Sequence, residues 1–280
     1  MPSEFTTHIV LFTVMLRVLR YLHAIIESLR IAFADAYQFN ADPSVEPVPV
    51  KGMLSPDYLA ERSTFYNPTK ASTFTHGSPP QCDTVYFAVT DRWGNGASFI
   101  NSLYCHFGSG IIPKSTGFSL HNRGANFSLS ASHPNVIEPD KRPYHTLIPA
   151  MLTNPADGSL HTVYGVMGGF MQPQGHVQVL LNMLVFKLKP QAALDAPRIC
   201  LAAGTPDQGS EVDSTVYIEE GISEKAVETL RAMGHQVQVV TGWERSVFGR
   251  GQVIKVHYQG NQIIYSAGSD PRGDGMAVPA

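Results

Sequence analysis

Two strand-forming runs joined by a tight turn constrain the fold of this chain more than any other feature. Residues 84–91 and 97–103 are both dense in β-branched and aromatic residues. The turn between them ends in Asn95-Gly96, a dipeptide that favours antiparallel hairpins because both residues tolerate positive φ angles. A hairpin is therefore predicted here. It follows a polar stretch, residues 70–83, which has too few apolar residues to pack and is expected to be accessible.

Helices are indicated by apolar residues that recur at three-to-four spacing. One such run covers residues 18–36. A short helix is expected over residues 56–63 with Ser55 as its N-cap, and another begins after Ser223 and stops at Gly234. A further helix is predicted over residues 172–186.

The remaining strands complete the prediction of the fold. Asp157-Gly158 predicts a second hairpin that joins residues 147–152 to residues 160–166. Because strands and helices alternate in blocks instead of strict βαβ repeats, we expect an α+β layered sandwich with antiparallel pairing. The final strands are expected over residues 236–240, 253–258 and 262–265.

Composition excludes several classes of function. A net charge of −3 and a pI near 6.4 argue against a nucleic-acid partner. The apolar opening, residues 9–16, is too short to span a bilayer, and neither a membrane segment nor a signal peptide is expected. The eleven histidines lack ligand spacing, so no metal or other cofactor is expected. Localisation stays open, although an odd set of cysteines favours free thiols in a reducing, cytoplasmic compartment: Cys82, Cys105 and Cys200.

Thr84, at the start of the first strand, is a candidate nucleophile. Threonine is a weak nucleophile unless it is the N-terminal residue, whose own α-amine can act as the base. That amine has an ordinary pKa of about 7.7–8.0, so much of it is neutral near physiological pH. The chain between Asp83 and Thr84 must first be cut, and the accessible stretch before a rigid strand suits such a cut. The alternative is a threonine that only favours the strand.

Gly168-Gly169 is a candidate oxyanion site. Two glycines before a helix let backbone N–H groups approach a ligand without interference from a Cβ, and the helix N-terminus assists. The alternative is a tight turn between a strand and a helix.

Short motifs in a fixed order carry a resemblance to a known family. From Arg17 to about residue 275 they resemble the γ-glutamyltransferase (glutathione hydrolase) family, first the end of its large subunit and then its small subunit. The motifs Asn-Arg-Gly-Ala-Asn-Phe and Lys-Arg-Pro-Tyr-His-Thr resemble the glutathione-hydrolase-like branch, which is near the glutaryl-cephalosporin acylases. The matching segments are residues 27–35, 52–58, 83–91, 94–95, 98–104, 107–110, 117–128, 133–135, 141–146, 165–174, 248–252 and 268–272.

The resemblance implies an N-terminal nucleophile hydrolase with an αββα sandwich, made as a precursor that cuts itself at Asp83-Thr84. It divides the chain into an unmatched leader (1–16), the end of a large-subunit-like segment with a processing loop at 70–83 (17–83), and a small-subunit-like catalytic segment (84–280). Because family precursors carry most of the large subunit before the equivalent of Arg17, the sandwich is expected to be incomplete at its N-terminus. The two subunits are expected to come from one precursor.

The family's functional residues carry over position by position. Thr84 takes the place of the nucleophile, Ser102 that of a hydroxyl residue hydrogen-bonded to it, and Gly168 with Gly169 that of the oxyanion hole. Typical members hold the glutamyl α-amine with asparagine, acidic or amide groups. Here Arg123 stands at one of these positions, where it would repel a cation and favour an anionic acyl group without an amine. The positions matched to substrate contacts are Tyr104, Arg123, Asn126, His145 and Thr146.

The expected function is therefore hydrolysis or transfer of γ-glutamyl groups from glutathione and related amides, through an acyl-threonine intermediate. One alternative is an amidase or acylase for an anionic, amine-free acyl group such as glutaryl, which Arg123 and Asn126 favour. Another is a truncated, inactive family fragment. The expected partner in either active case is a small-molecule amide.

Overall fold

The computed structural model describes residues 4–72, 83–201 and 215–279, with side chains from Arg20 onward apart from that of Asp83. The chain forms two compact units. The first unit comprises Met1–Pro79, Asn126–Tyr144 and Leu201–Val239, and the second comprises Pro80–Ala125, His145–Cys200 and Val240–Ala280.

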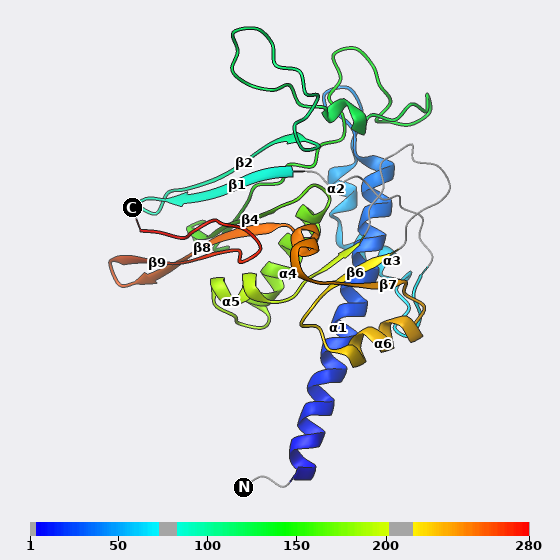
Figure 1. Cartoon of the computed structure of the whole chain (residues 1–280), viewed down its shortest axis with the longest axis vertical. Coiled ribbons are helices and arrows are strands. Elements are labelled where there is room, and N and C mark those ends of the chain that lie inside the picture. The colour runs from blue at the N-terminus through cyan, green and yellow to red at the C-terminus, as the bar shows by residue number, and fades with distance from the viewer. Residues whose placement is uncertain (1–3, 73–82, 202–214, 280) are drawn as a thin grey trace. The chain divides into compact units, whose positions relative to one another are not determined.

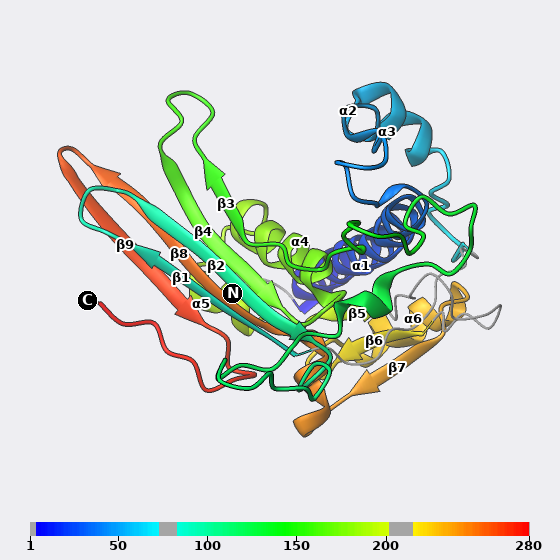
Figure 2. The ribbon, with the colours of Figure 1, turned by 90° about the horizontal axis from the view of Figure 1, so that it is seen from above.

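The second unit is built in layers around a four-stranded antiparallel sheet (Figure 1). A two-stranded hairpin lies on one face of this sheet and two helices lie on the other. Seen from above, the hairpin lies over the larger sheet and extends along its strands (Figure 2). The sheet has the order β3 (Ala150–Thr153), β4 (Leu160–Met167), β8 (Arg250–Gln259) and β9 (Gln262–Ser269); the hairpin is β1 (Asp83–Thr90) with β2 (Gly96–Tyr104); the helices are α4 (Met171–Leu184) and α5 (Pro190–Asp195).

Strand β4 is covered on both faces, which explains its nearly continuous apolar sequence. Tyr164 and Val166 face the helices and pack with Val179, Met183 and Leu194 in the core. The alternate residues face the hairpin because successive side chains of a strand point to opposite sides. Strand β4 therefore lies at the centre of the unit, between the helices and the hairpin.

The hairpin packs closely on β4 through two glycines. A Cβ placed on Gly165 would lie 2.6 Å from the ring of Tyr86, and one on Gly96 would lie 2.8 Å from the side chains of Leu160 and Val163. The far end of the hairpin, at Gly96, thus lies over the start of β4, and Tyr86 lies over Gly165, which is later in β4. Strand β1 therefore runs over β4 in the opposite direction.

The other face of the hairpin is apolar and exposed. Phe87 pairs with Phe99 across the two strands, and their rings stack with centroids 4.9 Å apart. Val85 and Val89 lie on the same face and are also exposed, whereas Tyr86 on the opposite face is buried. The strict alternation confirms the predicted strands.

The first unit contains the long helix α1 (Glu4–Phe39), which packs against α6 (Glu224–Ala232) (Figure 1). Its buried face includes Leu22, Ile26 and Leu29, at the spacing expected of an amphipathic helix. None of the helices in the described ranges is long and apolar enough to cross a membrane. The other helices of this unit are α2 (Val50–Met53) and α3 (Pro56–Ser63). A three-stranded sheet has the order β5 (Ile199–Leu201), β6 (Val216–Glu219) and β7 (Val237–Val240), and only the last residue of β5 belongs to this unit. The described chain also has two 3₁₀ turns, η1 (Arg123–Asn126) and η2 (Gly242–Phe248).

The structure confirms the predicted hairpins and helix caps. Ser55 Oγ accepts a hydrogen bond from Tyr58 N at 3.3 Å, and Ser223 Oγ accepts one from Ala226 N at 3.4 Å. The first helix begins at Glu4 instead of residue 18, so residues 9–16 continue an amphipathic helix that was predicted too short. Helix α5 and strands β5 and β6 were not predicted, because their short runs carry too few periods to be recognised.

Part of the sequence prediction lies outside the described residues. The processing loop falls there from residue 73 to residue 82, and so does Cys82. Of the other two cysteines, Cys105 is half-buried and Cys200 is buried, and both are free thiols. Burial raises the pKa of the Cys200 thiol to about 12, although a hydrogen bond from Gln174 partly opposes this.

Candidate active site

Thr84 opens the hairpin with its hydroxyl directed at Ser102 on the neighbouring strand. Thr84 Oγ1 donates to Ser102 Oγ at 3.2 Å, and that serine oxygen also accepts a hydrogen bond from Tyr104 N at 2.8 Å. The register between β1 and β2 shifts between Asp83 and Val85. Such a bulge re-aims the side chain next to it. The predicted nucleophile and its hydroxyl partner are therefore in contact, and Thr84 is only 2% exposed.

Tyr104 connects this pair to a buried cation. Its backbone has φ 78°, a left-handed conformation that non-glycine residues rarely adopt. The guanidinium carbon of Arg123 lies 5.1 Å from the centroid of its ring. Arg123 NH1 donates to Thr146 Oγ1 at 2.8 Å, and both of these side chains are buried. The positive charge of Arg123 is thus placed beside the residue whose backbone contacts Ser102.

Gly168 and Gly169 link the end of β4 to α4. Their φ angles are +126° and +57°, which only glycine adopts without strain. Their carbonyls accept hydrogen bonds from Met171 N and Gln172 N, the first residues of the helix. The helix has no side-chain cap, since Phe170 stands at its N-cap position. This backbone fits both predicted alternatives, an oxyanion site and a tight turn between a strand and a helix, so the oxyanion role stays a prediction.

The packing of the two strands relates this diglycine to Thr84. Gly96 is paired with Thr90 at the far end of the hairpin and lies over Leu160 and Val163, whereas Tyr86 lies over Gly165. Continuing in the same sense along β1 brings its first residues toward the end of β4. The diglycine follows β4 at that end.

His145 and Asn126, two of the predicted substrate contacts, lie in different surroundings from the other three. His145 is exposed, in contrast to its buried neighbour Thr146. Asn126 is fully buried in the first unit, where its Nδ2 donates to Tyr144 O at 2.9 Å and its carbonyl oxygen accepts from Asn135 Nδ2 at 2.6 Å. The structure therefore brings Thr84, Ser102, Tyr104, Arg123 and Thr146 together through direct contacts. The side-chain amide of Asn126 instead bonds to the backbone of a neighbouring segment.

In the part of the chain that the structure describes, one group of side chains has the composition of a metal site. His23, Glu27 and His235 are buried in the first unit with their ligand atoms within 4.8 Å of one another. Arg30 NH1 lies 3.2 Å from His235 Nδ1, and a guanidinium can only donate. His235 Nε2 then carries the proton that His23 Nδ1 accepts at 2.8 Å, and His23 Nε2 donates to a backbone carbonyl at 2.7 Å.

This arrangement is a hydrogen-bond relay between neutral imidazoles. A metal at the centre would need the His235 Nε2 lone pair and a proton on Nδ1, where it would face the Arg30 guanidinium. Burial, Arg30 and His23 together lower the pKa of His235 to about 3. The residues therefore fit a structural cluster better than a metal site. Sequence spacing could not reveal it, because the two histidines are 212 positions apart.

A second buried charged cluster was also missed. Arg198 and Asp270 form an ion pair of 2.6 Å, and both side chains are 1% exposed. Burial alone raises the pKa of Asp270, but Arg198, Arg272 and two backbone N–H groups outweigh it and lower the pKa below its usual value. The segments 248–252 and 268–272 match family motifs, but no role was predicted for them.

Known proteins resemble this chain along most of its length. The family model Gamma-glutamyltranspeptidase matches residues 6–280. The glutathione hydrolase-like YwrD proenzyme of Bacillus subtilis is 36% identical over 261 residues, covering 92% of this chain and 47% of that protein. The oxamate amidohydrolase proenzyme of Klebsiella pneumoniae subsp. pneumoniae is 32% identical over 257 residues, with the same coverage of 92% and 47%. The chain therefore spans about half the length of these curated relatives.

A solved structure agrees in fold. The crystal structure of cephalosporin acylase from Bacillus halodurans matches with a TM-score of 0.78 and 38% identity, covering 92% of this chain and 44% of that chain. The α+β prediction is confirmed, and the fold is that of the N-terminal nucleophile hydrolases. With the family model matching nearly all of its residues, this chain belongs to the gamma-glutamyltranspeptidase family.

Proposed function

We propose that this chain is the catalytic part of an amide hydrolase or acyltransferase whose nucleophile is Thr84, freed as an N-terminus by cleavage after Asp83. The observation that carries this proposal is the buried Thr84 hydroxyl, which donates to Ser102 at the start of a rigid hairpin. Family membership gives the reaction class, acyl transfer from an amide.

The first step is self-cleavage. The Thr84 hydroxyl oxygen attacks the carbonyl carbon of Asp83, its proton is transferred to the Thr84 nitrogen, and the C–N bond breaks as an ester forms. Water then hydrolyses this ester and returns the hydroxyl of Thr84, which now has a free α-amine. Both curated relatives described above are named as proenzymes, which supports this order of events.

The same atoms then act on substrate. The free α-amine accepts the hydroxyl proton while Thr84 Oγ1 attacks the amide carbonyl. Backbone N–H groups at Gly168 and Gly169 stabilise the oxyanion, and the leaving amine takes the proton as the acyl-threonine ester forms. Water releases the acid, or an acceptor amine takes the acyl group.

The acyl group that the site favours carries a carboxylate. Arg123 holds a buried positive charge next to Tyr104, and a cation of this kind pairs with a carboxylate through charge-assisted hydrogen bonds. γ-Glutamyl amides such as glutathione meet this requirement. A glutaryl amide meets it without the α-ammonium group that Arg123 would repel, so we place amine-free acyl groups first. The names of the oxamate amidohydrolase and the cephalosporin acylase show that the family acts beyond glutathione.

Hydrolysis of paired anilides tests the proposal. The purified chain is assayed with glutaryl and γ-glutamyl p-nitroanilide, with Thr84→Ala as the control that lacks the nucleophile and Thr84→Ser as the variant that keeps a hydroxyl. We expect turnover of both substrates, a higher kcat/KM for glutaryl, activity in the serine variant and none in the alanine variant. Equal turnover by Thr84→Ala would contradict the assignment. A folded chain without activity on either substrate would favour the inactive-fragment alternative.

A further inference from the structure

The turn at Gly249 is in direct contact with the diglycine. A Cβ placed on Gly168 would lie 3.2 Å from Gly249 Cα, and one placed on Gly249 would collide with the carbonyl oxygen of Met167. Gly249 has φ +66°, so the backbone there is also in a glycine conformation. The two main chains touch without an intervening side chain. The position of the Gly249 turn therefore limits where the peptide groups of Gly168 can lie.

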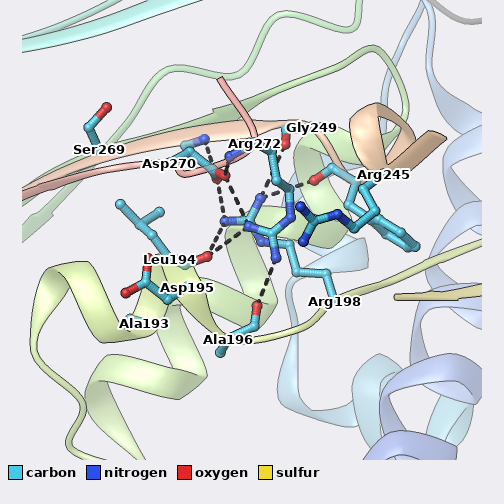
Figure 3. Close-up of polar contacts among 12 residues, drawn as sticks. Ala193, Leu194, Asp195, Ala196, Arg198, Arg245, Gly249, Ser269, Asp270 and Arg272 are labelled. Carbon is cyan, nitrogen blue, oxygen red and sulfur yellow. Dashed lines mark hydrogen bonds and ion pairs between the residues drawn. The ribbon is translucent and has the colours of Figure 1, made fainter. Parts of the chain in front are cut away.

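A buried arginine holds the carbonyl groups of this turn (Figure 3). Arg198 NH1 donates to Phe248 O at 3.0 Å and to Gly249 O at 3.4 Å. Its NH2 group donates to Asp270 Oδ2 at 2.6 Å and to Leu194 O at 3.1 Å. One guanidinium thus joins the turn, the end of α5 and the strand end that carries Asp270.

Asp270 fixes the arginine and the strand that follows the turn. Its Oδ2 also accepts a hydrogen bond from Gly251 N at 2.8 Å, and its own N–H donates to Gly251 O at 3.0 Å. Its Oδ1 accepts from Arg272 NH1 at 3.0 Å. Arg272 in turn donates to Leu194 O at 2.8 Å and to Ala196 O at 3.1 Å. The residues on both sides of Arg250 are therefore held by one carboxylate and one guanidinium.

We propose that Arg198 and Asp270 are positioning residues for the oxyanion site: they fix the Gly249 turn, and the turn fixes the peptide groups of Gly168 and Gly169. This inference rests on the proposed function of Thr84 and the diglycine. Oxyanion donors must lie about 2.7–3.1 Å from the developing charge. A displacement of about 1 Å at a reacting centre can cost about 100-fold in rate. The ion pair therefore controls the rate without touching substrate.

Two variants test this role. Asp270→Asn removes the negative charge but keeps the shape of the side chain, and Arg198→Lys keeps the positive charge but loses the several N–H donors of the planar guanidinium. Asp195→Asn is the matched control, because Asp195 is an exposed residue of the adjacent α5 whose Oδ1 accepts a hydrogen bond from Gln191 Nε2. For each variant we measure thermal unfolding, the rate of self-cleavage by intact mass, and kcat and KM per folded molecule on glutaryl p-nitroanilide.

We expect both cluster variants to lose about 10- to 100-fold in self-cleavage rate and in kcat, with KM changed less than about twofold, and Asp195→Asn to match the unchanged chain. Variants that lose stability but keep kcat and cleavage per folded molecule would overturn the inference, because that is what a structural role predicts. If Asp270→Asn does not fold, Arg198→Lys decides. Should Thr84→Ala remain active, the proposed function fails. If Thr84→Ala is inactive and the cluster variants are unimpaired, only the positioning role fails.

Discussion

Thr84 Oγ1 lies 3.2 Å from Ser102 Oγ and donates to it across the two strands of the hairpin. The serine oxygen also accepts the backbone N–H of Tyr104, so it is fixed in place. A fixed partner of this kind orients the threonine hydroxyl before any substrate arrives. The hairpin therefore supplies the proposed nucleophile and its orientation within a span of about twenty residues.

Removing the serine hydroxyl is expected to slow catalysis. Ser102→Ala leaves Thr84 Oγ1 without its oriented acceptor, and we expect kcat to fall about 10-fold or more, with a smaller change in KM. Ser98→Ala is the matched control, since Ser98 lies on the same strand and its hydroxyl is within 2.8 Å of Tyr86 OH. Steady-state assays on glutaryl p-nitroanilide compare the two. Equal effects of the two changes would count against a special role for Ser102.

Removing the charge of Arg123 is expected to change acyl specificity. In Arg123→Gln the buried cation is removed, so an α-ammonium group is no longer repelled and a carboxylate loses its partner. We expect the ratio of kcat/KM for γ-glutamyl over glutaryl p-nitroanilide to rise by about 10-fold or more. Arg142→Gln, which removes an exposed guanidinium from its ion pair with the buried carboxylate of Asp42, serves as the charge control. No rise in this ratio would contradict the assignment of Arg123 to the acyl site.

Acid is expected to destabilise the first unit through His235. Burial, Arg30 and His23 lower the pKa of His235 to about 3, whereas an unfolded histidine has a pKa near 6.5. Between these two values the histidine is protonated in the unfolded chain but not in the folded chain. The free energy of unfolding is therefore highest above about pH 6.5 and declines as the pH falls toward about 3. In urea unfolding at several pH values, His235→Asn should flatten this decline. His257→Asn is the control, and an unchanged slope in His235→Asn would refute the link.

Filling the space between the hairpin and β4 is expected to cost stability. A Cβ on Gly165 would lie 2.6 Å from the Tyr86 ring, so Gly165→Ala forces the hairpin away from the sheet. We expect a loss of about 1–3 kcal/mol in the free energy of unfolding. A Cβ on Gly124 has nothing within 4 Å, so Gly124→Ala is the control. Denaturant titration measures both, and equal stability of the two variants would argue against this packing.

The sequence predicts those parts of the fold that are set by neighbouring residues. The turn residues before β2 predict the hairpin, although its positive φ lies at Gly94 and Gly96 already pairs with Thr90 in the strand. Ser223 fixes the start of α6, because a cap depends on a few adjacent side chains. Thr84 and Ser102 are matched through the family resemblance and not through the hairpin register, and the register shift between Asp83 and Val85 leaves no signal in the sequence.

Contacts between distant segments escape this kind of prediction. Arg198 and Asp270 are 72 positions apart, and neither lies in a pattern that reveals its partner. The relay of His23 and His235 is hidden for the same reason. The placement of the Gly249 turn against Gly168 depends on two glycine backbones, which leave no side-chain pattern to recognise. Such contacts depend on how the layers pack.

The most direct test of the account is an intact-mass time course of the purified chain, followed by N-terminal sequencing of the products. We predict two fragments, residues 1–83 and 84–280, whose masses add up to that of the chain plus one water, with Thr84 as the new N-terminus. Thr84→Ala should stay whole under the same conditions. A folded chain that remains uncut, or a Thr84→Ala variant that is cut at the same bond, would contradict the central role given to Thr84.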